Sequence, residues 1–326
     1  MKDGLTFLIT GGTGSFGRAF VDTVLRECNP RSIRVYSRDE LKQFEMQERL
    51  QDPRVRYLIG DIRDSERLNR AMDGVDVAVH AAALKQVVTA EYNPIEAVRT
   101  NIDGTINVIN ASIDRRVPRL MFLSTDKAVA PVNLYGATKM AAERVCVNGN
   151  VYGGVDTLIS CVRYGNVLGS RGSVVNTFLK QREQGVLTLT DPGMTRFWIT
   201  VEQGVTFVLN SLDRMVGGEV FVPKIPVSDV KTLADAIAPD ARHEVIGARP
   251  GEKRHESLIG IEESVHTLEY EDSYVIDFYG RLREVGGHGG ITADAPFEFR
   301  SDSLSITLTV NELSDLIKST ESANST

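Results

Sequence analysis

Short, almost continuously apolar runs alternate with amphipathic stretches along the first half of the chain. The runs at residues 6–10, 33–36, 55–59, 75–80, 120–123 and 157–162 have the length of strands, and their apolar character on both faces favours a parallel sheet covered by helices. Residues 16–26, 40–50 and 95–115 lie between these runs and space their apolar positions as helices do. This alternation predicts an α/β fold built on a doubly wound parallel sheet.

The pattern loosens after residue 166, where short strands, glycines and helices mix. We expect a helix at 201–214 and a strand at 219–222 that returns to the main sheet. The remaining pieces predict a smaller lobe over the strand ends. We therefore divide the chain into a sheet domain of residues 1–166 plus about 194–224, a smaller C-terminal lobe of about 167–193 and 225–280, and a C-terminal extension of 281–326.

Two patterns mark the C-terminal extension. Residues 280–296 are rich in glycine and polar groups, which is typical of a mobile connection. Thr309 and Glu312 then form a capping-box pattern, which predicts a short final helix.

A glycine-rich turn follows the first strand and opens the first helix. Gly11 permits a tight turn, Gly14 lets the backbone approach a pyrophosphate, and Gly17 lets helix and strand pack closely. The spacing is G-x-x-G-x-x-G, and its place between strand and helix indicates a dinucleotide site in a Rossmann-like fold. The residues of this turn assigned to the cofactor are Gly11, Thr13, Gly14, Ser15, Phe16 and Gly17.

The end of the second strand decides which dinucleotide is favoured. Ser37 and Arg38 are able to hold a 2′-phosphate, so the sequence favours NADP over NAD. Two alternatives stay open: Asp39 accepts the ribose hydroxyl instead, or Arg38 only begins the next helix. Further cofactor contacts are expected near the adenine and beside small side chains after the fourth strand, at Asp61, Ile62, Ala81, Ala82 and Ala83.

Composition narrows the class of protein. The net charge of −7 over 326 residues disfavours a nucleic-acid binder. No signal peptide is evident, and no stretch reaches the roughly 18–20 apolar residues that span a bilayer. The three cysteines are scattered as in a reduced, cytoplasmic protein, and the five histidines lack ligand spacing, so we expect neither a membrane partner nor a metal centre.

A catalytic pattern follows the fifth strand. Tyr135 and Lys139 are four residues apart at a helix start, so both face one side and can point at a nicotinamide. A tyrosine has an ordinary pKa of about 10, and a sheltered cation is needed to lower it. Asp126 and Lys127 precede this pair, and a plain dehydrogenase does not need them. That additional acid and amine point to loss of water from a sugar.

These motifs resemble the extended short-chain dehydrogenase/reductase superfamily and, within it, the UDP-N-acetylglucosamine 4,6-dehydratases of bacterial glycan synthesis, best known for the inverting enzyme type. The resemblance covers residue 5 to about residue 280. The segments that carry it are 11–17, 36–46, 83–86, 90–94, 124–128, 133–139, 163–167, 169–174, 194–198 and 249–253.

The resemblance implies an NADP-dependent hydro-lyase mechanism. Tyr135, with Lys139 beside it, takes the O4 proton while C4 is oxidised, and Thr125 bonds that oxygen. Lys127 removes the C5 proton and Asp126 protonates the departing C6 hydroxyl. Lys127 must be neutral to act as the base, which we expect a sheltered site near other cations to arrange.

The resemblance also implies the ligands and the assembly. The sheet domain binds NADP, with Lys85 and Asn101 as further contacts, and the lobe binds UDP-N-acetylglucosamine or a close UDP-HexNAc. A homo-oligomer, a dimer or a hexamer, is expected. Gln86 stands where relatives often carry histidine, which leaves substrate detail and the C5 outcome open. The substrate-binding candidates are Lys85, Asn166, Arg171, Arg196, Arg249 and Glu252.

Rival functions remain on the same fold. A retaining dehydratase or a UDP-HexNAc epimerase uses the same Tyr135 and Lys139, and an epimerase does not require Asp126 and Lys127 as a pair. A non-catalytic NADP-sensing protein needs only the phosphate site. Arg196 fits a structural ion pair as well as a substrate contact.

Overall fold

The main sheet carries the predicted parallel strands in a doubly wound order. The computed structural model describes residues 3–153, 156–170, 172–294, 296–303 and 306–325. Within these residues the main sheet has ten strands, of which seven run parallel in the order β3, β2, β1, β4, β5, β6 and β10. Their bounds are β1 Thr6–Thr10, β2 Ser32–Ser37, β3 Val55–Ile59, β4 Val77–His80, β5 Arg119–Leu123, β6 Leu158–Val162 and β10 Glu219–Pro223. The predicted Rossmann-like fold is confirmed.

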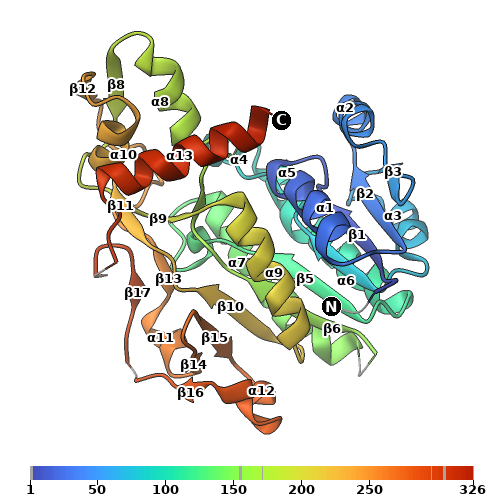
Figure 1. Ribbon diagram of the computed structural model, residues 1–326. Coiled ribbons are helices and arrows are strands. Elements are labelled where there is room, and N and C mark those ends of the chain that lie inside the picture. Colours follow the sequence, from blue (N-terminus) through green and yellow to red (C-terminus); the bar gives the residue numbers. More distant parts are fainter. Residues whose placement is uncertain (1–2, 154–155, 171, 295, 304–305, 326) are drawn as a thin grey trace.

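Helices cover both faces of this sheet (Figure 1). α1 packs against α9 on one face, and α3, α6 and α7 pack against one another on the opposite face. The strands between them are buried on both sides, which explains why their sequences read as continuous apolar runs. The helices are α1 Ser15–Glu27, α2 Glu40–Leu50, α3 Ser65–Met72, α6 Gly104–Asp114, α7 Leu134–Gly153 and α9 Val201–Arg214.

The helix expected at 95–115 is interrupted. α5 (Pro94–Val98) passes into a π-helical turn, η1 (Arg99–Asp103), before α6 begins. The preceding segment holds a further helix, α4 (Val87–Tyr92), for which the sequence analysis gave no range. A π-turn widens the backbone, and such turns often occur at functional sites. Here it aims Asn101 at the loop after β4.

Three antiparallel strands extend the sheet beyond β10. They are β15 (Ser273–Asp277), β14 (Thr267–Glu269) and β16 (Ile291–Thr292). The expectation of a mobile connection at 280–296 is therefore wrong for its described residues, since α12 (Arg281–Glu284), the short turn η3 (Gly287–Gly289) and β16 lie within it. Its glycines supply left-handed turns between these elements. The domain boundaries given above remain a prediction, but these strands belong to the main sheet.

A smaller lobe stands over the carboxyl ends of the parallel strands. Its own core gathers α8 (Val174–Arg182), β8 (Val186–Leu189) and α10 (Val230–Ile237), with β12 (Arg242–Val245) paired to β8. The final helix α13 (Val310–Ser325) packs on α10 through Leu313 and Ile317. The capping box is present, because Thr309 N donates to Glu312 Oε2 at 2.8 Å and Glu312 N donates to Thr309 Oγ1 at 3.3 Å.

Short pairings link the lobe to the sheet. β9 (Thr195–Ile199) lies between β7 (Asn166–Val167) and β11 (Val227–Asp229). β13 (Ser257–Ile259) pairs with β17 (Phe299–Arg300) from the C-terminal extension, and α11 (Ile261–Ser264) follows β13. None of the described helices combines the length and the apolar character needed to cross a membrane.

Candidate active site

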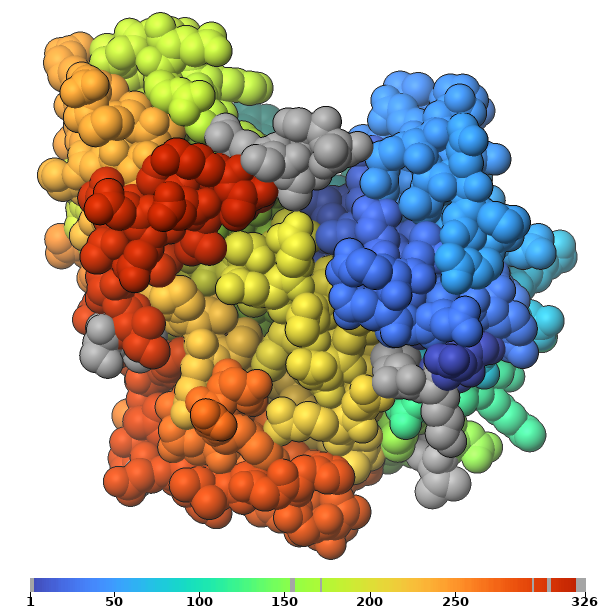
Figure 2. Space-filling model, in the orientation of Figure 1, coloured from blue at the N-terminus to red at the C-terminus, as the bar shows by residue number. Residues whose placement is uncertain are grey.

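A single deep cleft joins the glycine-rich turn to the small lobe. Its volume is about 1090 Å³, and Figure 2 shows the molecule hollowed between the segment around α2 and the lobe that carries α8. Most of the predicted site residues line it. They are Gly11, Thr13, Gly14, Ser15, Phe16, Gly17, Ser37, Arg38, Asp61, Ile62, Ala81, Ala82, Ala83, Lys85, Thr125, Lys127, Tyr135, Lys139, Asn166, Arg196, Arg249 and Glu252.

The glycine-rich turn is shaped to receive a pyrophosphate. Gly11 has φ +67°, and a Cβ there would lie 2.9 Å from the backbone of Ala82. A Cβ on Gly17 would lie 2.4 Å from the carbonyl oxygen of Gly12, so helix and turn meet only because side chains are absent. No side chain caps the start of α1, whose N-terminus faces the cleft. The residues present therefore fit a dinucleotide phosphate.

The end of β2 presents cations at the rim of the cleft. Arg38 is exposed and its Nη1 lies 3.4 Å from Asp61 Oδ2, while Ser37 Oγ bonds Thr13 Oγ1 at 2.9 Å. Asp39 caps α2 by accepting from Lys42 N at 3.1 Å, and its carboxylate also pairs with Lys42 Nζ. The Asp39 carboxylate thus already binds groups of its own helix, so it is less available to accept a hydrogen bond from a ribose hydroxyl.

Asn101 differs from its expected placement. It is buried and does not line the cleft, because its side chain bridges two other elements. Its Oδ1 accepts from Leu84 N at 2.8 Å, and its Nδ2 donates to Leu84 O and to Thr138 Oγ1, each at 3.0 Å. The residue fixes the loop after β4 against α7, and so acts on the cleft through that loop.

The predicted catalytic residues meet where α7 approaches η2, the turn at Asp126–Ala128. A Cβ on Gly136 would lie 2.3 Å from Lys127 O, so only glycine allows this approach. Thr125 caps the turn, and its Oγ1 donates to Asp126 Oδ1 at 3.0 Å. Tyr135 is thereby brought to the same part of the cleft as Thr125 and Lys127.

Lys127 is held between two carboxylates. Its Nζ lies 3.0 Å from Asp126 Oδ1 and 3.4 Å from Glu256 Oε1. Burial disfavours the ammonium, but Asp126 and Glu256 outweigh that cost and raise the pKa of Lys127 above its ordinary value. The expectation that neighbouring cations keep this amine neutral is therefore wrong for the protein without ligands, since Arg196 is outweighed by the acids.

Asp126 lies beneath the cleft surface. It is fully buried and contacts the cleft through Thr125 and Lys127. Its second oxygen, Oδ2, has no hydrogen-bond partner among the described residues. An unpaired buried carboxylate oxygen is costly, so this atom is suited to a hydroxyl that a ligand brings.

Tyr135 and Lys139 occupy one buried helical face. Burial raises the pKa of Tyr135 to about 12, while Lys127 acts in the opposite direction. Burial lowers the pKa of Lys139 to about 8. The Lys139 ammonium donates to Leu123 O at 2.6 Å and lies 3.9 Å from the centre of the Phe122 ring. In the unliganded protein the cation that lowers the pKa of Tyr135 is thus Lys127, and not the predicted Lys139.

The substrate-binding candidates surround the opposite end of the cleft. Arg196 donates to the carbonyls of Thr195, Arg254 and Lys253 at 2.7 to 3.0 Å and so holds the 253–254 backbone. It makes no ion pair with an acid of the described residues. Arg249 is exposed, and its N–H donates to Glu252 Oε2 at 3.1 Å.

Two further candidates complete this end of the cleft. Asn166 has a buried Oδ1 without a hydrogen-bond partner among the described residues. Arg171 lies outside the described residues.

Glu256 and Lys253 were missed by the sequence analysis. Both line the cleft, and Lys253 Nζ lies 3.4 Å from Glu256 Oε2. Glu256 is 129 positions from Lys127 and follows no motif for acid or base chemistry. The nearest signal was the run of charged residues at 252–256, which reads as an exposed loop in the sequence.

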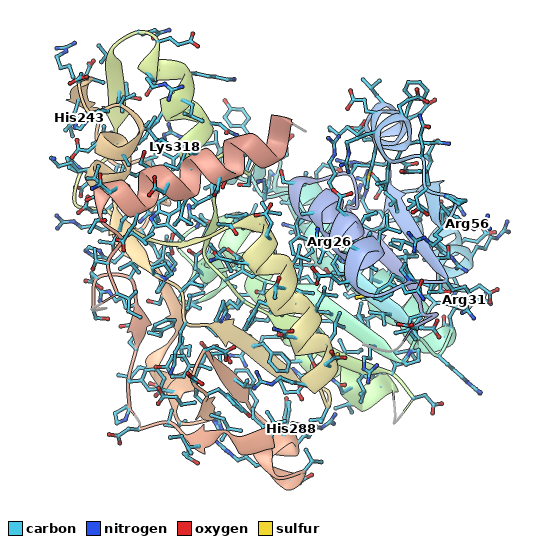
Figure 3. The ribbon with its side chains drawn as sticks, viewed as in Figure 1. Arg26, Arg31, Arg56, His243, His288 and Lys318 are labelled. Atoms are coloured by element: carbon cyan, nitrogen blue, oxygen red, sulfur yellow. The ribbon has the colours of Figure 1, made fainter. Side chains whose placement is uncertain are left out.

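The histidines form no common site. His80 is buried between Thr10 Oγ1 at 2.7 Å and Thr105 Oγ1 at 3.0 Å, and burial lowers its pKa to about 3. His243 and His288 lie at opposite ends of the molecule (Figure 3). Among the described residues no group of three or more metal-binding side chains comes together.

Comparison with known proteins places this cleft in a family. The model of a family described as "Polysaccharide biosynthesis protein" matches residues 7–277. A Campylobacter jejuni protein named UDP-N-acetylglucosamine 4,6-dehydratase (inverting) is 47% identical, with 98% of this chain and 99% of that protein covered. A Rickettsia conorii protein named UDP-glucose 4-epimerase is 42% identical, with 85% and 84% covered.

Solved structures agree on the fold. The X-ray structure of Pen from Bacillus thuringiensis superposes with a TM-score of 0.90 at 37% identity, covering 98% of each chain. A dTDP-glucose 4,6-dehydratase from Streptomyces venezuelae has a TM-score of 0.69 at 22% identity, covering 76% of this chain and 86% of that one, and shows the fold alone. The chain therefore belongs to the polysaccharide biosynthesis protein family and to the family of the Campylobacter proteins named UDP-N-acetylglucosamine 4,6-dehydratase (inverting).

Proposed function

We propose that this protein is a UDP-N-acetylglucosamine 4,6-dehydratase of bacterial glycan biosynthesis. It oxidises C4, eliminates water across C5 and C6, and reduces C6 to give a UDP-4-keto-6-deoxy-HexNAc with inversion at C5. The observation that carries the proposal is the contact of Lys127 with Asp126 at 3.0 Å in the cleft that also holds Tyr135 and the phosphate cradle. The name and 47% identity of the Campylobacter relatives support the same reaction.

The chain's own residues supply the proton chemistry. A nicotinamide dinucleotide held by the glycine-rich turn would supply the hydride acceptor for C4 and the hydride donor for C6. The Tyr135 phenolate accepts the O4 proton, and Thr125 bonds O4 and orients it. A phenol with a pKa near 12 is protonated at neutral pH, so Tyr135 needs a positive charge close to it in the complex. Lys139 orients that face of the cleft through Leu123.

Asp126 and Lys127 carry out the elimination. Lys127 Nζ removes the C5 proton, which the C4 ketone makes acidic, and Asp126 gives its proton to the departing O6. The pair starts as carboxylate and ammonium, and one proton moved along the 3.0 Å contact converts it to carboxylic acid and amine. This transfer supplies the acid and the base together, without the neighbouring cations expected from the sequence.

We propose NADP as the cofactor. The support is the pair of cations, Arg38 and Lys42, beside Ser37 at the rim of the cleft, and the engagement of Asp39 as a helix cap. A 2′-phosphate gains from both cations, whereas a ribose hydroxyl needs an available acid. Mass spectrometry of the cofactor released from the purified protein distinguishes NADP from NAD.

We propose the following setting for the enzyme. The sheet domain binds the cofactor, and the small lobe, through Asn166, Arg249 and Glu252, binds the UDP part of the substrate. The protein forms a homo-oligomer, which sedimentation velocity measures. The thiols of Cys28, Cys146 and Cys161 are free and buried, which supports a location in the reducing cytoplasm.

One experiment separates this function from its rivals. The protein is incubated with UDP-N-acetylglucosamine in deuterated water, and the product is analysed by mass spectrometry and proton NMR. Dehydration gives a product lighter by one water, with deuterium at C5, and the H5 coupling reports whether C5 is inverted or retained. An unchanged covalent composition with a new C4 configuration would establish the epimerase, which the Rickettsia relatives' name keeps as the second candidate. No conversion would favour the sensor.

A further inference from the structure

Glu256 is a buried carboxylate that joins two lysines at the cleft. It is 3% exposed. Its Oε1 lies 3.4 Å from Lys127 Nζ and its Oε2 lies 3.4 Å from Lys253 Nζ. Lys253 is anchored by donating to Val129 O at 2.6 Å. Burial of a carboxylate is costly unless cations accompany it, so the arrangement fixes one ionised acid directly beside the proposed base.

The C-terminal extension holds this acid in place. Ser301, which directly follows β17, accepts from Glu256 N through Oγ at 2.9 Å, and Ser301 N donates to Glu256 O at 2.8 Å. The same hydroxyl contacts Thr195 Oγ1 of β9 at 2.6 Å. Ser301 is 1% exposed. The extension, to which the sequence assigned no role, thus determines where the Glu256 backbone lies.

We propose that Glu256 is a positioning residue that acts through Lys127, and that Ser301 places it there. Glu256 directs Lys127 Nζ into the cleft and stabilises the ammonium that forms when this nitrogen takes a carbon-bound proton. The inference rests on the proposed dehydratase function and extends it by a third charged group and by a structural role for the C-terminal extension.

The charge balance of the step gives Glu256 its effect. As neutral Lys127 takes the C5 proton, the C5–H electron pair becomes the C5=C6 double bond. The C6–O bond breaks, and Asp126 protonates the leaving oxygen to water. Lys127 ends as an ammonium and Asp126 as a carboxylate. Glu256 keeps its negative charge throughout. It therefore stabilises the positive charge of Lys127, which is present after the proton transfer and absent before it.

The groups that face Lys127 set the expected pH dependence. Asp126 and Glu256 favour its ammonium, and Arg196 of β9 opposes it. Tyr135 of α7 lies in the same part of the cleft and interacts with this charge, and Lys253 lies beyond Glu256. Removing the Glu256 charge lowers the pKa of Lys127 and weakens it as a base.

The test measures C5 exchange alone. The 4-keto product made by the unaltered enzyme is returned to each variant in deuterated water, and deuterium at C5 is followed by mass spectrometry across a pH series. For Glu256→Gln we expect the acid limb of exchange to move to lower pH by about one unit or more. The highest exchange rate falls about 10-fold, as the weaker base requires. Ser301→Ala shifts the limb in the same direction by a smaller amount.

Glu298→Gln is the matched control. This acid lies one residue before β17 and accepts from Ser257 Oγ at 2.6 Å, so it shares the strand pair but has no contact with Lys127. Its profile should equal that of the parent. If Glu256→Gln lowers the exchange rate equally at every pH, or does not lower it at all, the inference is overturned. If that variant does not fold, an unshifted Ser301→Ala profile overturns it. Absence of conversion by the parent contradicts the proposed function instead.

Discussion

At the scale of single residues, the decisive contact is between neighbours in the chain. Asp126 and Lys127 are adjacent, yet they act as a pair only because the turn at η2 brings both side chains to one side. The same turn puts Thr125 on Asp126 Oδ1. The carboxylate therefore has two donors on one oxygen and none among the described residues on the other, which leaves Oδ2 open to a hydroxyl of a ligand.

Replacing Lys127 should separate oxidation from elimination. In Lys127→Ala the Tyr135 hydroxyl and the cofactor cradle stay in place, so the near-ultraviolet absorbance of reduced nicotinamide still appears on mixing with substrate. It should appear more slowly than in the parent, because Tyr135 loses the cation that lowers its pKa. Dehydrated product should fall by about 10²- to 10⁴-fold, the usual contribution of a positioned base. Lys231→Ala, which removes an exposed lysine paired with Asp235, should behave like the parent. Product formation at the parental rate by Lys127→Ala would disprove the base assignment.

At the scale of elements, the catalytic geometry depends on how closely α7 approaches η2. The helix start carries Tyr135, the turn carries Lys127, and Gly136 lies between them at the contact. The start of α7 is also tied to the loop at residue 251, because the Asn133 side chain accepts from Gly136 N at 2.8 Å and donates to Gly251 O at 2.7 Å.

A methyl group at this contact should disturb the site more than the fold. Gly136→Ala places Cβ 2.3 Å from Lys127 O, so the turn must shift, and we expect a loss of about 1–3 kcal/mol in stability. Activity should fall further than stability explains. Gly204→Ala in α9 meets no atom within 4 Å and should be neutral or stabilising by up to about 1 kcal/mol. Thermal unfolding and turnover of both variants check this difference.

The stability that His80 in β4 gives to the folded protein should decrease in acid. The pKa of His80 is lowered from 6.5 to about 3 in the folded protein, so between these values the unfolded chain binds more protons. The stabilisation is full above pH 6.5 and is lost as pH falls towards 3, by about 2 kcal/mol near pH 5. Denaturant unfolding at several pH values measures it. In His80→Gln this part of the pH dependence should disappear, even though the variant is less stable overall.

The elements were predictable where the pattern was local. β1, β3, α2 and α9 have the bounds read from the sequence. β1 is buried on both faces and gives a continuous apolar run, and the helices have one apolar face and give a helical period. The π-turn at η1 was not predictable, since its apolar positions also fit a continuous helix. β16 is a strand because it pairs with β14, and a glycine-rich sequence does not predict such a pairing.

The same limit applies to the site. Tyr135 and Lys139 share a helix, and the glycine-rich turn is one segment, so spacing alone indicated both. Glu256 reaches Lys127 only through the packing of the lobe on the sheet. Asp126 and Glu256 together favour the ammonium of Lys127, and this is why the neutral state expected for that amine was wrong.

At the scale of the whole molecule, the cleft is made by two cores that meet. The main core surrounds the parallel sheet, and the second core lies in the small lobe. α13 crosses the outside of the lobe in Figure 1 and closes the second core with Leu313 and Ile317. The last helix thus supports the lobe from outside, and residues of α8 and α10 in the same lobe line the cleft.

Weakening that helix should loosen one half of the cleft. Leu313 is fully buried, so Leu313→Ala should destabilise by about 2–5 kcal/mol. We expect cofactor binding to be retained and the KM for the UDP-sugar to rise, because only the lobe loses packing. Val310→Ala, at a position 39% exposed on the same helix, should change neither by a measurable amount. Differential scanning calorimetry with steady-state kinetics tests both, and an unchanged KM in Leu313→Ala would count against the lobe assignment.

The strand pair of β13 with β17 has a consequence for biogenesis. The Ser301 hydroxyl fixes the position of Glu256, an acid that precedes it by 45 residues. A ribosome-bound chain can complete the Rossmann-like half, and bind its dinucleotide, while this hydroxyl is still untranslated. The nascent protein therefore acquires the support of its base only after residue 301 has been added, and a chain that stops before β17 should bind the cofactor but eliminate water poorly.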